Sequence, residues 1–434
     1  MRDNILTLFP PKEPFQHSLN LSGSKSFMNR ALILGALSET PVLLKNPSRS
    51  EDSLTLLELL KQFGVTSRWR EQGALEISRN RSQVPVDVTL DVGAGGTVMR
   101  FMTAFAASCE GAEIILCGSE RMHERPIGPL VEALRTLGAD IDYLGTEGCP
   151  PLRIRGKTLK GGEVQVDGSL SSQFLTALLL TGATFENGIT IMPQGELVSR
   201  SYLSMTIQTI RAFNGDVAFG DADRIMVSPG RLNCSEYLVE GDASGASYFW
   251  ALAAISGGSI SVGPFPEDSR QGDLEFLKNL EWMGCSVERD LTNSSFIVKG
   301  PAGRLRPLEA DMVNLPDSAQ TLAVLTAVAD GVSILKGLKT LRVKETDRIA
   351  ALEQELRRVG VRSESTDDTL VIHGISPSAL RKAAIRTYDD HRMAMSFSVL
   401  GAILPGLQIE NPSVVAKSFP DFWTRLFAIG LDEL

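Results

Sequence analysis

The chain has few residues of the types that build disulfide frameworks and metal sites. Its 434 residues include 5 cysteines and 4 histidines. The cysteines are odd in number and widely spaced, and no CxxC pair occurs, so neither a disulfide framework nor a zinc site is expected. No two histidines have the spacing of metal ligands. We therefore expect reduced thiols, a cytoplasmic location and no bound metal.

Positively charged residues are fewer than negatively charged ones, and long apolar runs are missing. The 43 lysines and arginines face 52 aspartates and glutamates, which gives a formal net charge of −9. Such a chain does not attract nucleic acid through its general field, so any basic site must be local. No apolar stretch reaches the roughly 18 residues that span a bilayer, and the first residues lack the pattern of a signal peptide. We expect neither nucleic acid nor a membrane as partner.

What the chain does contain is an internal repeat. Six segments share a short polar or glycine-rich opening that leads into an apolar, helix-like run of small residues. Successive segments begin 71 to 76 residues apart. Their first residues are Ser24, Gly95, Ser171, Ser244, Asp317 and Asp390.

A second marker keeps the same spacing. Helix-like stretches end in an apolar residue followed by glycine, as in LKQFGV and ALRTLGA. Glycine suits the left-handed residue that ends a helix. A strand-like stretch follows the first five of these glycines. The six lie at Gly64, Gly138, Gly215, Gly284, Gly360 and Gly430.

The two markers predict an α/β protein of six repeats, each of about 72 residues with a buried helix, an amphipathic helix and several strands. Because 434 residues are too many for one ordinary core, we expect two domains of three repeats each. The first domain is predicted to span residues 21–239. The second combines residues 1–20 with 240–434, since the strand-like Ile5–Phe9 is expected to join the C-terminal half. The chain then crosses between domains near residues 20 and 240.

Polar residues gather at the openings of the apolar helices. Helix N-termini present unpaired N–H groups and a partial positive charge, which suits anions. Several such openings together could bind an anion even in an acidic protein. The openings carry Lys25, Ser26, Gly96, Ser171, Ser172, Gln173, Ser244, Asp317, His391 and Arg392.

Ordinary helix capping competes with this interpretation. Serine and aspartate are common N-caps, and for Ser244 and Ser318 we favour that reading. Capping does not explain Lys25 or Arg392, because a cation in the first turn opposes the helix dipole unless an anion lies opposite. These two positions, together with Arg125, favour a bound anion.

Further cations lie outside the helix openings. RMHERPIGPL contains Arg125, which is followed by proline, and VVAKSFPDFW contains Lys417. LRVKETDRIAALEQEL contains Lys344 and Arg348, a like-charged i,i+4 pair if the segment is helical. Cations that repel each other on one helix face make sense where they share an anion. Rigid loops are usual places for site residues.

The motifs together resemble the 5-enolpyruvylshikimate-3-phosphate synthase family. SGSKSFMNRA, GGTVMRF, RMHERPIG, DGSLSSQF, EGDAS, PDSA, RVKETDR, DDHRMAM and AKSFPDFW occur in that family's order and cover almost the whole chain. The resemblance implies two domains of three inverse α/β units each, with helix N-termini facing an interdomain cleft. It also implies transfer of the enolpyruvyl group of phosphoenolpyruvate to the 5-hydroxyl of shikimate 3-phosphate. No electrons move in that reaction, so no cofactor is expected, and we expect a monomer.

Residue roles follow from the same resemblance. Asp317, Glu345 and Lys25 should be catalytic, with the two carboxylates handling protons. Phosphoenolpyruvate should contact Lys25, Gly96, Arg125, Gln173, Arg348, Arg392 and Lys417. Shikimate 3-phosphate should contact Lys25, Ser26, Arg30, Ser171, Ser172, Gln173, Ser199, Tyr202, Asp317 and Lys344.

Some positions depart from the family's commonest pattern. Ala94 and Gly95 stand where many relatives have Asn and Ala, and Phe101 replaces a frequent Pro. Thr340 and Leu341 stand where Asn and Trp are common, so no acceptor contact is assigned to Thr340. The family's inhibitor glyphosate occupies the phosphoenolpyruvate pocket beside Gly96, which this chain retains.

Three alternatives remain open. The enolpyruvyl transferase that acts on UDP-N-acetylglucosamine shares the repeat fold, but its loop cysteine is replaced here by Glu120, and Cys117 is out of register. A non-catalytic anion-binding relative would be expected to lose Lys25, Asp317 or Glu345. An RNA-processing enzyme on a similar repeat fold is disfavoured by the acidic charge.

Overall fold

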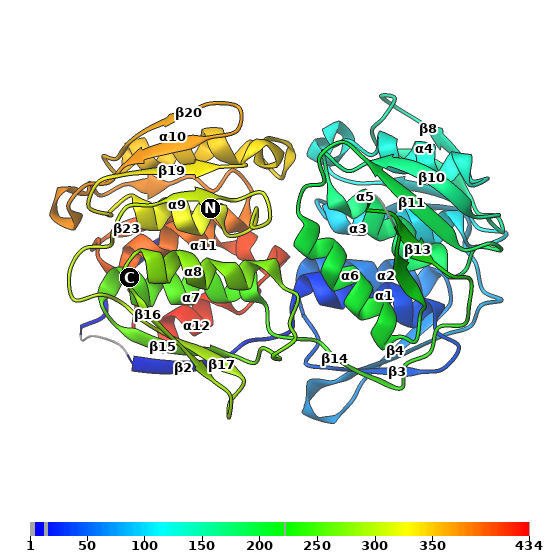
Figure 1. Cartoon of the computed structure of the whole chain (residues 1–434), viewed down its shortest axis with the longest axis horizontal. Coiled ribbons are helices and arrows are strands. Elements are labelled where there is room, and N and C mark those ends of the chain that lie inside the picture. The colour runs from blue at the N-terminus through cyan, green and yellow to red at the C-terminus, as the bar shows by residue number, and fades with distance from the viewer. Residues whose placement is uncertain (1–4, 13–15, 221–222, 434) are drawn as a thin grey trace. The chain divides into compact units, whose positions relative to one another are not determined.

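The computed structural model describes residues 5–12, 16–220 and 223–433. Its contacts divide the chain into two compact units. Gly23–Val239 forms what we call the N-terminal unit. Glu240–Leu434 together with Met1–Ser22 forms the C-terminal unit. Each unit has its own hydrophobic core, so the two are described separately below (Figure 1).

Within the described ranges, the strands form six four-stranded sheets that share one plan. In each sheet one edge strand runs parallel to its neighbour, and the remaining pairs are antiparallel. A repeat contributes strand, buried helix, strand, amphipathic helix and two further strands. The predicted fold class of six α/β repeats is therefore confirmed.

The N-terminal unit contains the first three repeats. The first comprises β14 (Glu236–Leu238), α1 (Lys25–Leu37), β3 (Val42–Lys45), α2 (Glu51–Gln62), β4 (Val65–Trp69) and β5 (Leu75–Arg79). The second comprises β6 (Val86–Asp91), α3 (Gly96–Ala107), β7 (Glu113–Cys117), α4 (Gly128–Thr136), β8 (Asp140–Tyr143) and β9 (Leu152–Arg155). The third comprises β10 (Gly162–Asp167), α5 (Ser172–Gly182), β11 (Ile189–Gln194), α6 (Arg200–Ala212), β12 (Val217–Phe219) and β13 (Ile225–Val227).

The C-terminal unit contains the other three repeats. The fourth comprises β2 (Gln16–Asn20), α7 (Ala243–Ser256), β15 (Ser259–Gly263), α8 (Phe276–Trp282), β16 (Ser286–Asp290) and β17 (Ser295–Lys299). The fifth comprises β18 (Glu309–Asp311), α9 (Ala319–Thr326), β19 (Val332–Lys336), α10 (Arg348–Arg358), β20 (Arg362–Ser365) and β21 (Leu370–His373). The sixth comprises β22 (Ala384–Ile385), α11 (His391–Ser398), β23 (Leu407–Glu410), α12 (Phe422–Ala428), β24 (Asp432–Glu433) and β1 (Ile5–Phe9).

The first helix of each repeat is almost wholly buried, and most of its side chains are apolar. In α7 the side chains of Tyr248, Phe249 and Trp250 are almost completely buried, although they are consecutive. Each large side chain removed from water contributes about 1.5–3 kcal/mol. The helices α1, α3 and α5 pack together in one core, and α9 packs against α7 and α11 in the other. Their N-terminal residues are thereby held on rigid supports.

Three repeats are completed by strands from distant parts of the chain. β14 pairs in parallel with β3, almost 200 residues earlier in sequence, and β2 pairs in parallel with β15. β1 pairs with β23 and with β24, both antiparallel. β1 thus lies in the sheet of the sixth repeat, and β24 provides a strand after Gly430 that the sequence did not reveal.

The predicted helix-ending glycines are left-handed with one exception. Gly64 has φ 80°, and a Cβ there would lie 2.2 Å from the carbonyl oxygen of Asn80, so no other residue fits without rearrangement. At the third repeat the prediction is wrong, because the left-handed residue is Asn214, with φ 58°, rather than Gly215. Asparagine tolerates this conformation better than most side chains.

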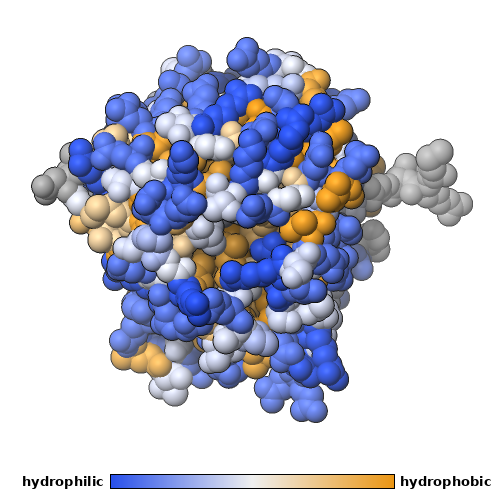
Figure 2. Space-filling model, turned by 90° about the vertical axis from the view of Figure 1, so that its right-hand side faces the viewer, coloured by the Kyte–Doolittle hydropathy of each residue, from blue (hydrophilic) through white to orange (hydrophobic). Residues whose placement is uncertain are grey.

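No helix in the described part of the chain is long and apolar enough to cross a membrane. Figure 2 shows one face of the N-terminal unit, on which hydrophilic side chains predominate and hydrophobic ones form small separate areas. Exposed Val86 and Phe219 belong to that unit. Scattered apolar residues of this kind are normal on protein surfaces.

Candidate active site

Arg348 is the centre of a buried ionic cluster in the C-terminal unit. It is the first residue of α10, whose N-cap Asp347 accepts hydrogen bonds from the N–H groups of Ile349 and Ala350. Its side chain is 2% exposed, and its Nε lies 2.7 Å from Oδ2 of Asp390, which is fully buried. The start of one helix is thus joined to the N-cap of α11.

Two further carboxylates contact the same guanidinium group. Nη2 of Arg348 donates to Oε2 of Glu345 at 3.0 Å, and Nη1 donates to Oδ1 of Asp317 at 3.4 Å. Burial alone would lower the pKa of Arg348, but the negative charges of Asp390, Glu345 and Asp317 outweigh it and raise that pKa above its ordinary value. The structure therefore brings Asp317, Glu345 and Arg348 together, as their predicted roles require.

Arg392, in the first turn of α11, binds Asp317 from a second direction. Its Nη2 lies 2.7 Å from Oδ2 of Asp317, and its Nη1 donates to the Asp317 carbonyl oxygen at 2.8 Å. Nη1 also donates to the phenol oxygen of Tyr248 on α7 at 3.2 Å. Burial raises the pKa of Tyr248 to about 12, so its hydroxyl stays protonated at neutral pH.

Lys417 completes this group of cations. It ends a short 3₁₀ helix, Pro412–Lys417, and its Nζ lies 2.7 Å from Oε1 of Glu345. Both oxygens of Glu345 are therefore hydrogen-bonded, one to Lys417 and one to Arg348. Glu345 is thereby paired with two cations from different elements.

The positive and negative charges of the cluster balance, and its side chains could bind anions and exchange protons. Buried ions destabilise a fold unless they are paired, and here each cation has a carboxylate. Arginine can also bind a phosphate or a carboxylate through two parallel hydrogen bonds. A buried carboxylate can exchange protons at a pH set by its surroundings. The members named above are Arg348, Arg392, Lys417, Asp317, Glu345 and Asp390.

In the N-terminal unit, Lys25 is paired within the chain. It begins α1, and its Nζ donates to Oδ2 of Asp52 at 3.0 Å. Asp52 is buried in the first turn of α2. The sequence predicts a bound anion opposite Lys25 and Arg392. In the structure a carboxylate of the protein lies there instead, Asp52 beside Lys25 and Asp317 beside Arg392. A cation at these helix starts is therefore not by itself evidence of a bound anion.

Arg30 joins α1 to α6. Its Nη1 donates to the carbonyl of Ser26 at 2.7 Å, its Nε to Oγ1 of Thr206 at 2.9 Å and its Nη2 to the carbonyl of Tyr202 at 3.1 Å. Burial lowers the pKa of Arg30 to about 10, so the group remains charged at neutral pH. The structure thus groups the predicted residues Arg30, Ser26 and Tyr202.

Arg125 lies against the start of α3. A Cβ atom on Gly96, the first residue of that helix, would come within 2.5 Å of Nη2 of Arg125. The loop after Arg125 is fixed from the same helix, since Nη2 of Arg100 donates to the carbonyl of Pro126 at 2.7 Å. Gly96 and Arg125 therefore form one local feature.

The start of α5 is tied to the start of α3. Ser171 is the N-cap of α5 and accepts from the N–H of Gln173 at 3.2 Å, and Ser172 is buried beside it. Nε2 of Gln173 donates to Oγ1 of Thr97 at 3.2 Å. Gln173 and its two serines are thereby brought near the Gly96 region.

Ser199 and Lys344 occupy unusual backbone positions. Ser199 is the N-cap residue of α6 with φ 55° and ψ 45°, and its side chain makes no cap hydrogen bond. Lys344 follows the 3₁₀ helix Lys339–Val343 in an extended conformation, and α10 begins only at Arg348. The expectation that Lys344 and Arg348 form a like-charged pair on one helix face is therefore wrong.

The capping predictions for the C-terminal unit are wrong as well. Asp242, not Ser244, caps α7. Ser318 occupies the N-cap position of α9 without capping it, and Asp317 precedes that position. The hydroxyls of Ser244 and Ser318 both donate to Asp273 instead. These side chains serve a tertiary contact that a local sequence pattern does not reveal.

Sequence reasoning missed the partners of the predicted residues. Asp52 and Asp390 are the carboxylates that bind Lys25 and Arg348. Their sequence signal is weak: Asp52 reads as an ordinary acidic first turn, and Asp390 as an N-cap. Asp273, in the short segment QGD, carried no signal at all. In the described residues, no group of histidine, cysteine or carboxylate side chains has an arrangement that could hold a metal ion.

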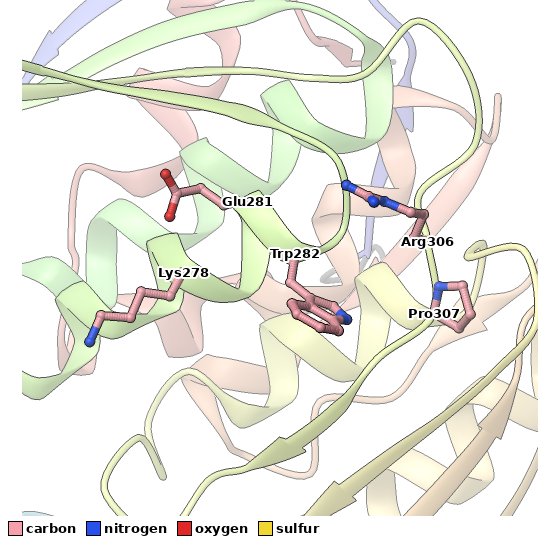
Figure 3. Close-up of a pocket in the computed structure, with 5 residues that line it drawn as sticks. All are labelled: Lys278, Glu281, Trp282, Arg306 and Pro307. Atoms are coloured by element: carbon pink, nitrogen blue, oxygen red, sulfur yellow. The ribbon is translucent and has the colours of Figure 1, made fainter.

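A surface pocket of the C-terminal unit lies apart from the predicted residues (Figure 3). Figure 3 shows the ring of Trp282 directed toward Pro307, with Arg306 above it. Trp282 is largely exposed. None of the predicted site residues lines this pocket, which consists of Lys278, Glu281, Trp282, Arg306 and Pro307.

Comparison with known proteins identifies the family. A family model described as EPSP synthase (3-phosphoshikimate 1-carboxyvinyltransferase) matches residues 10–426. Among curated relatives, the 3-phosphoshikimate 1-carboxyvinyltransferase of Vibrio atlanticus is 40% identical over 427 residues, which cover 97% of this chain and 98% of that protein. The enzyme of the same name from Yersinia ruckeri is 42% identical over 428 residues, covering 95% and 96%.

Solved structures agree with the sequence matches. An EPSP synthase from Acinetobacter baumannii superimposes with a TM-score of 0.81 at 26% identity and covers 99% of both chains. The enolpyruvyl transferase NikO from Streptomyces tendae has a TM-score of 0.79 at 16% identity, covering 100% of this chain and 99% of its own, and shows the fold alone. The match across nearly the full length, with the motif residues gathered at helix starts, means that the chain belongs to the EPSP synthase family.

Proposed function

We propose that this protein transfers the enolpyruvyl group of phosphoenolpyruvate to the 5-hydroxyl of shikimate 3-phosphate. The products are 5-enolpyruvylshikimate 3-phosphate and phosphate. The family match and the names of the relatives support this activity. The geometric observation that carries it is the pair of carboxylates, Asp317 and Glu345, hydrogen-bonded to the single guanidinium of Arg348. Two proton-exchanging groups beside an anion-binding one suit addition and elimination on a charged enol ester.

Phosphoenolpyruvate carries a phosphate and a carboxylate, and we assign arginines to both. Arg125 in the N-terminal unit, and Arg348 and Arg392 in the C-terminal unit, can each form two parallel hydrogen bonds with such groups. Lysine adds a compact charge that follows a phosphate through the reaction. The full proposed set is Lys25, Gly96, Arg125, Gln173, Arg348, Arg392 and Lys417.

Shikimate 3-phosphate adds a second phosphate and a ring of hydroxyls. Serine hydroxyls at the starts of α1 and α5 can hydrogen-bond a phosphate near the helix N-termini. Tyr202 is held by Arg30 and can pack on the carbon ring. The proposed contacts are Lys25, Ser26, Arg30, Ser171, Ser172, Gln173, Ser199, Tyr202, Asp317 and Lys344.

The two carboxylates divide the proton transfers between them. Asp317 accepts the proton of the attacking 5-hydroxyl as that oxygen bonds to C2 of phosphoenolpyruvate. Glu345 delivers a proton to the methylene carbon, which becomes a methyl group in the tetrahedral adduct. Glu345 then takes a proton back from that methyl group, which restores the double bond, and the phosphate leaves with the proton that Asp317 had accepted. Each carboxylate ends the cycle as it began.

Substrate binding should favour the protonated form of Glu345. In the structure, Lys417 and Arg348 neutralise its charge. An incoming phosphate or carboxylate competes for both cations and leaves Glu345 beside new negative charge. A like charge at close range favours the protonated form of a carboxyl group. Substrate binding and loading of the acid are thereby coupled.

We also propose that the protein acts as a monomer in the cytoplasm and needs no cofactor. Its five cysteines are free thiols, as is usual for proteins of reducing compartments. The reaction transfers an enolpyruvyl group and releases phosphate, and neither substrate is oxidised or reduced.

The proposal is tested by phosphate release. Purified protein is incubated with phosphoenolpyruvate and shikimate 3-phosphate, and parallel samples contain UDP-N-acetylglucosamine or no acceptor. We expect phosphate only with shikimate 3-phosphate, in equal amounts with the enolpyruvyl product. Release with UDP-N-acetylglucosamine instead would transfer the assignment to the other enolpyruvyl transferase. Binding of both substrates without release would indicate a non-catalytic relative.

A further inference from the structure

Asp273 is a buried carboxylate that joins two helix starts. It belongs to the short 3₁₀ helix Gly272–Glu275, between β15 and α8. Its Oδ2 accepts a hydrogen bond from the hydroxyl of Ser244, in the first turn of α7, at 2.8 Å. Its Oδ1 accepts from the hydroxyl of Ser318, the residue that follows Asp317. Asp273 is therefore hydrogen-bonded to the residue next to Asp317 in the chain.

The segment before Asp273 is fastened to the same place. Oε1 of Gln271 accepts from the N–H of Ala243, the first residue of α7, at 2.9 Å. Nε2 of Gln271 donates to the carbonyl of Gly241 at 2.8 Å and to the buried carboxylate of Glu240 at 3.0 Å. Asp273 is thus rigidly placed and has no freedom to turn toward solvent.

We infer that Asp273 is a positioning residue for Asp317: it anchors the backbone beside Asp317 through Ser318 and maintains a second negative charge close to the Asp317 carboxylate. The inference rests on the proposed function, in which Asp317 accepts the hydroxyl proton. Asp273 is not among the proposed substrate contacts.

The charge of Asp273 changes at a pH somewhat below neutrality. Burial raises its pKa to about 6, repulsion by Asp317 adds to the rise, and Ser318, Arg392 and Ser244 oppose it. Repulsion between two carboxylates acts on both, so ionised Asp273 strengthens the tendency of Asp317 to accept a proton. Above about pH 6, Asp317 should be the stronger base.

Other charged groups around the pair do not cancel this effect. Arg348 and Arg392 contact Asp317 directly, but Arg348 is also shared with Glu345 and Asp390. With Asp273 ionised, the cluster has one more negative charge than positive. The titratable groups that face Asp273 and Asp317 from the neighbouring elements are Tyr248, Glu345, Arg348, Asp390, Arg392 and Lys417, with Glu240 and Asp242 on the α7 side.

The test compares Asp273→Asn with wild type across pH. The side chain keeps its size and one oxygen acceptor but loses its charge. Turnover is measured by phosphate release at saturating substrates, and the ratio of variant to wild type is taken at each pH. The substrates' own phosphates also ionise near pH 6. Taking the ratio removes this effect, because it is the same for the variant and for wild type. We expect a ratio near one at about pH 5 that falls to about one tenth by about pH 7.5, as for one unit of base strength.

A control and a second variant keep the test decisive. Asp268→Asn, an exposed aspartate of the same loop, should leave the ratio at one throughout. The double variant Ser244→Ala, Ser318→Ala removes two hydrogen bonds that favour ionised Asp273, so ionisation moves to higher pH. Because it also removes the Ser318 anchor, its ratio should stay below one, with a minimum near about pH 7 and a partial rise by about pH 8.5. It also carries the test if Asp273→Asn does not fold.

The outcomes separate the two proposals. Ratios that are low but constant with pH in both variants would mean that Asp273 is only structural, and would overturn the inference. Wild-type protein that releases no phosphate from phosphoenolpyruvate and shikimate 3-phosphate would instead overturn the proposed function. Wild-type turnover with the two distinct pH profiles supports both.

Discussion

A Cβ atom on residue 96 would lie 2.5 Å from Nη2 and 2.7 Å from Nη1 of Arg125. Side-chain carbons do not approach other atoms so closely, so the guanidinium can rest against the start of α3 only because residue 96 is glycine. The contact involves the far end of a flexible side chain rather than backbone. An added methyl group would therefore move Arg125 and leave the helix in place.

We predict that Gly96→Ala weakens phosphoenolpyruvate binding without unfolding the protein. The KM for phosphoenolpyruvate should rise by about tenfold or more, as expected when a bidentate arginine contact is misplaced. The melting temperature should stay close to that of wild type. Gly230→Ala is the matched control, because a Cβ there meets no atom within 4 Å. An unchanged KM in Gly96→Ala would show that Arg125 does not bind this substrate.

Lys25→Met should lose almost all turnover and also some stability. The loss of turnover follows from the proposed contacts of Lys25 with both substrates. The loss of stability follows from Asp52, whose side chain is 6% exposed and would be left without its lysine. Breaking a buried pair by removing one partner destabilises by about 3 kcal/mol or more. Steady-state assays and urea unfolding measure the two effects.

The double variant Lys25→Met, Asp52→Asn separates these effects. Removing the second charge should recover most of the lost stability, since no uncompensated carboxylate remains. Turnover should stay low. If the double variant regained turnover along with stability, Lys25 would matter for folding rather than for substrates.

The repeat architecture could be predicted from sequence because its signals are local. An apolar run such as Leu32–Leu37 fixes a buried helix, and a glycine after an amphipathic run fixes its end. Both patterns recur at a constant spacing, so six weak signals reinforce one another. The same argument fails at Gly215, where Asn214 takes the left-handed conformation within one residue of the expected place.

The pairing inside the site could not be predicted, because it depends on tertiary packing. Asp52 lies 27 residues from Lys25, and Asp390 lies 42 residues from Arg348. No local periodicity links such positions. The sequence around Ser318 is typical of a helix cap, but its hydroxyl donates to Asp273, because α7 and α9 lie side by side. The family resemblance indicated which residues belong to the site, but not the hydrogen bonds that these residues make within the chain.

Asp317→Asn should fold and bind shikimate 3-phosphate but lose at least about a hundredfold in turnover, a usual size for general acid–base groups. Because Ser318 holds the N-cap position, the helix start does not depend on the Asp317 charge. Turnover and acceptor affinity are measured separately, the latter by calorimetry. Near-normal turnover would reduce Asp317 to an ion-pair partner of Arg392 and remove it as the base.

Glu345→Gln should act on proton delivery. Glutamine keeps an oxygen for Lys417 but cannot give up a proton to carbon. In deuterated water, deuterium should enter the methylene group of the donor at least about a hundredfold more slowly than in wild type. Glu309→Gln, which removes an exposed partner of Lys336, is the control and should exchange normally. Unimpaired exchange would assign the proton to another group.

The last prediction concerns stability and pH in the absence of substrate. The pKa of Asp273 is about 6 in the folded protein against an ordinary value of 3.8. Between these values the folded state holds more protons than the unfolded state, so the contribution of Asp273 to stability falls as pH rises through the window and stays lost above it. Asp273→Asn cannot titrate. Its unfolding free energy, relative to wild type, should therefore rise between about pH 4 and pH 6, by up to about 3 kcal/mol, and then level off. Urea unfolding at each pH measures the difference, with Asp268→Asn as the control that should show none. A difference independent of pH would mean that Asp273 is ionised throughout and that its charge is fully compensated by Arg392 and the two serines.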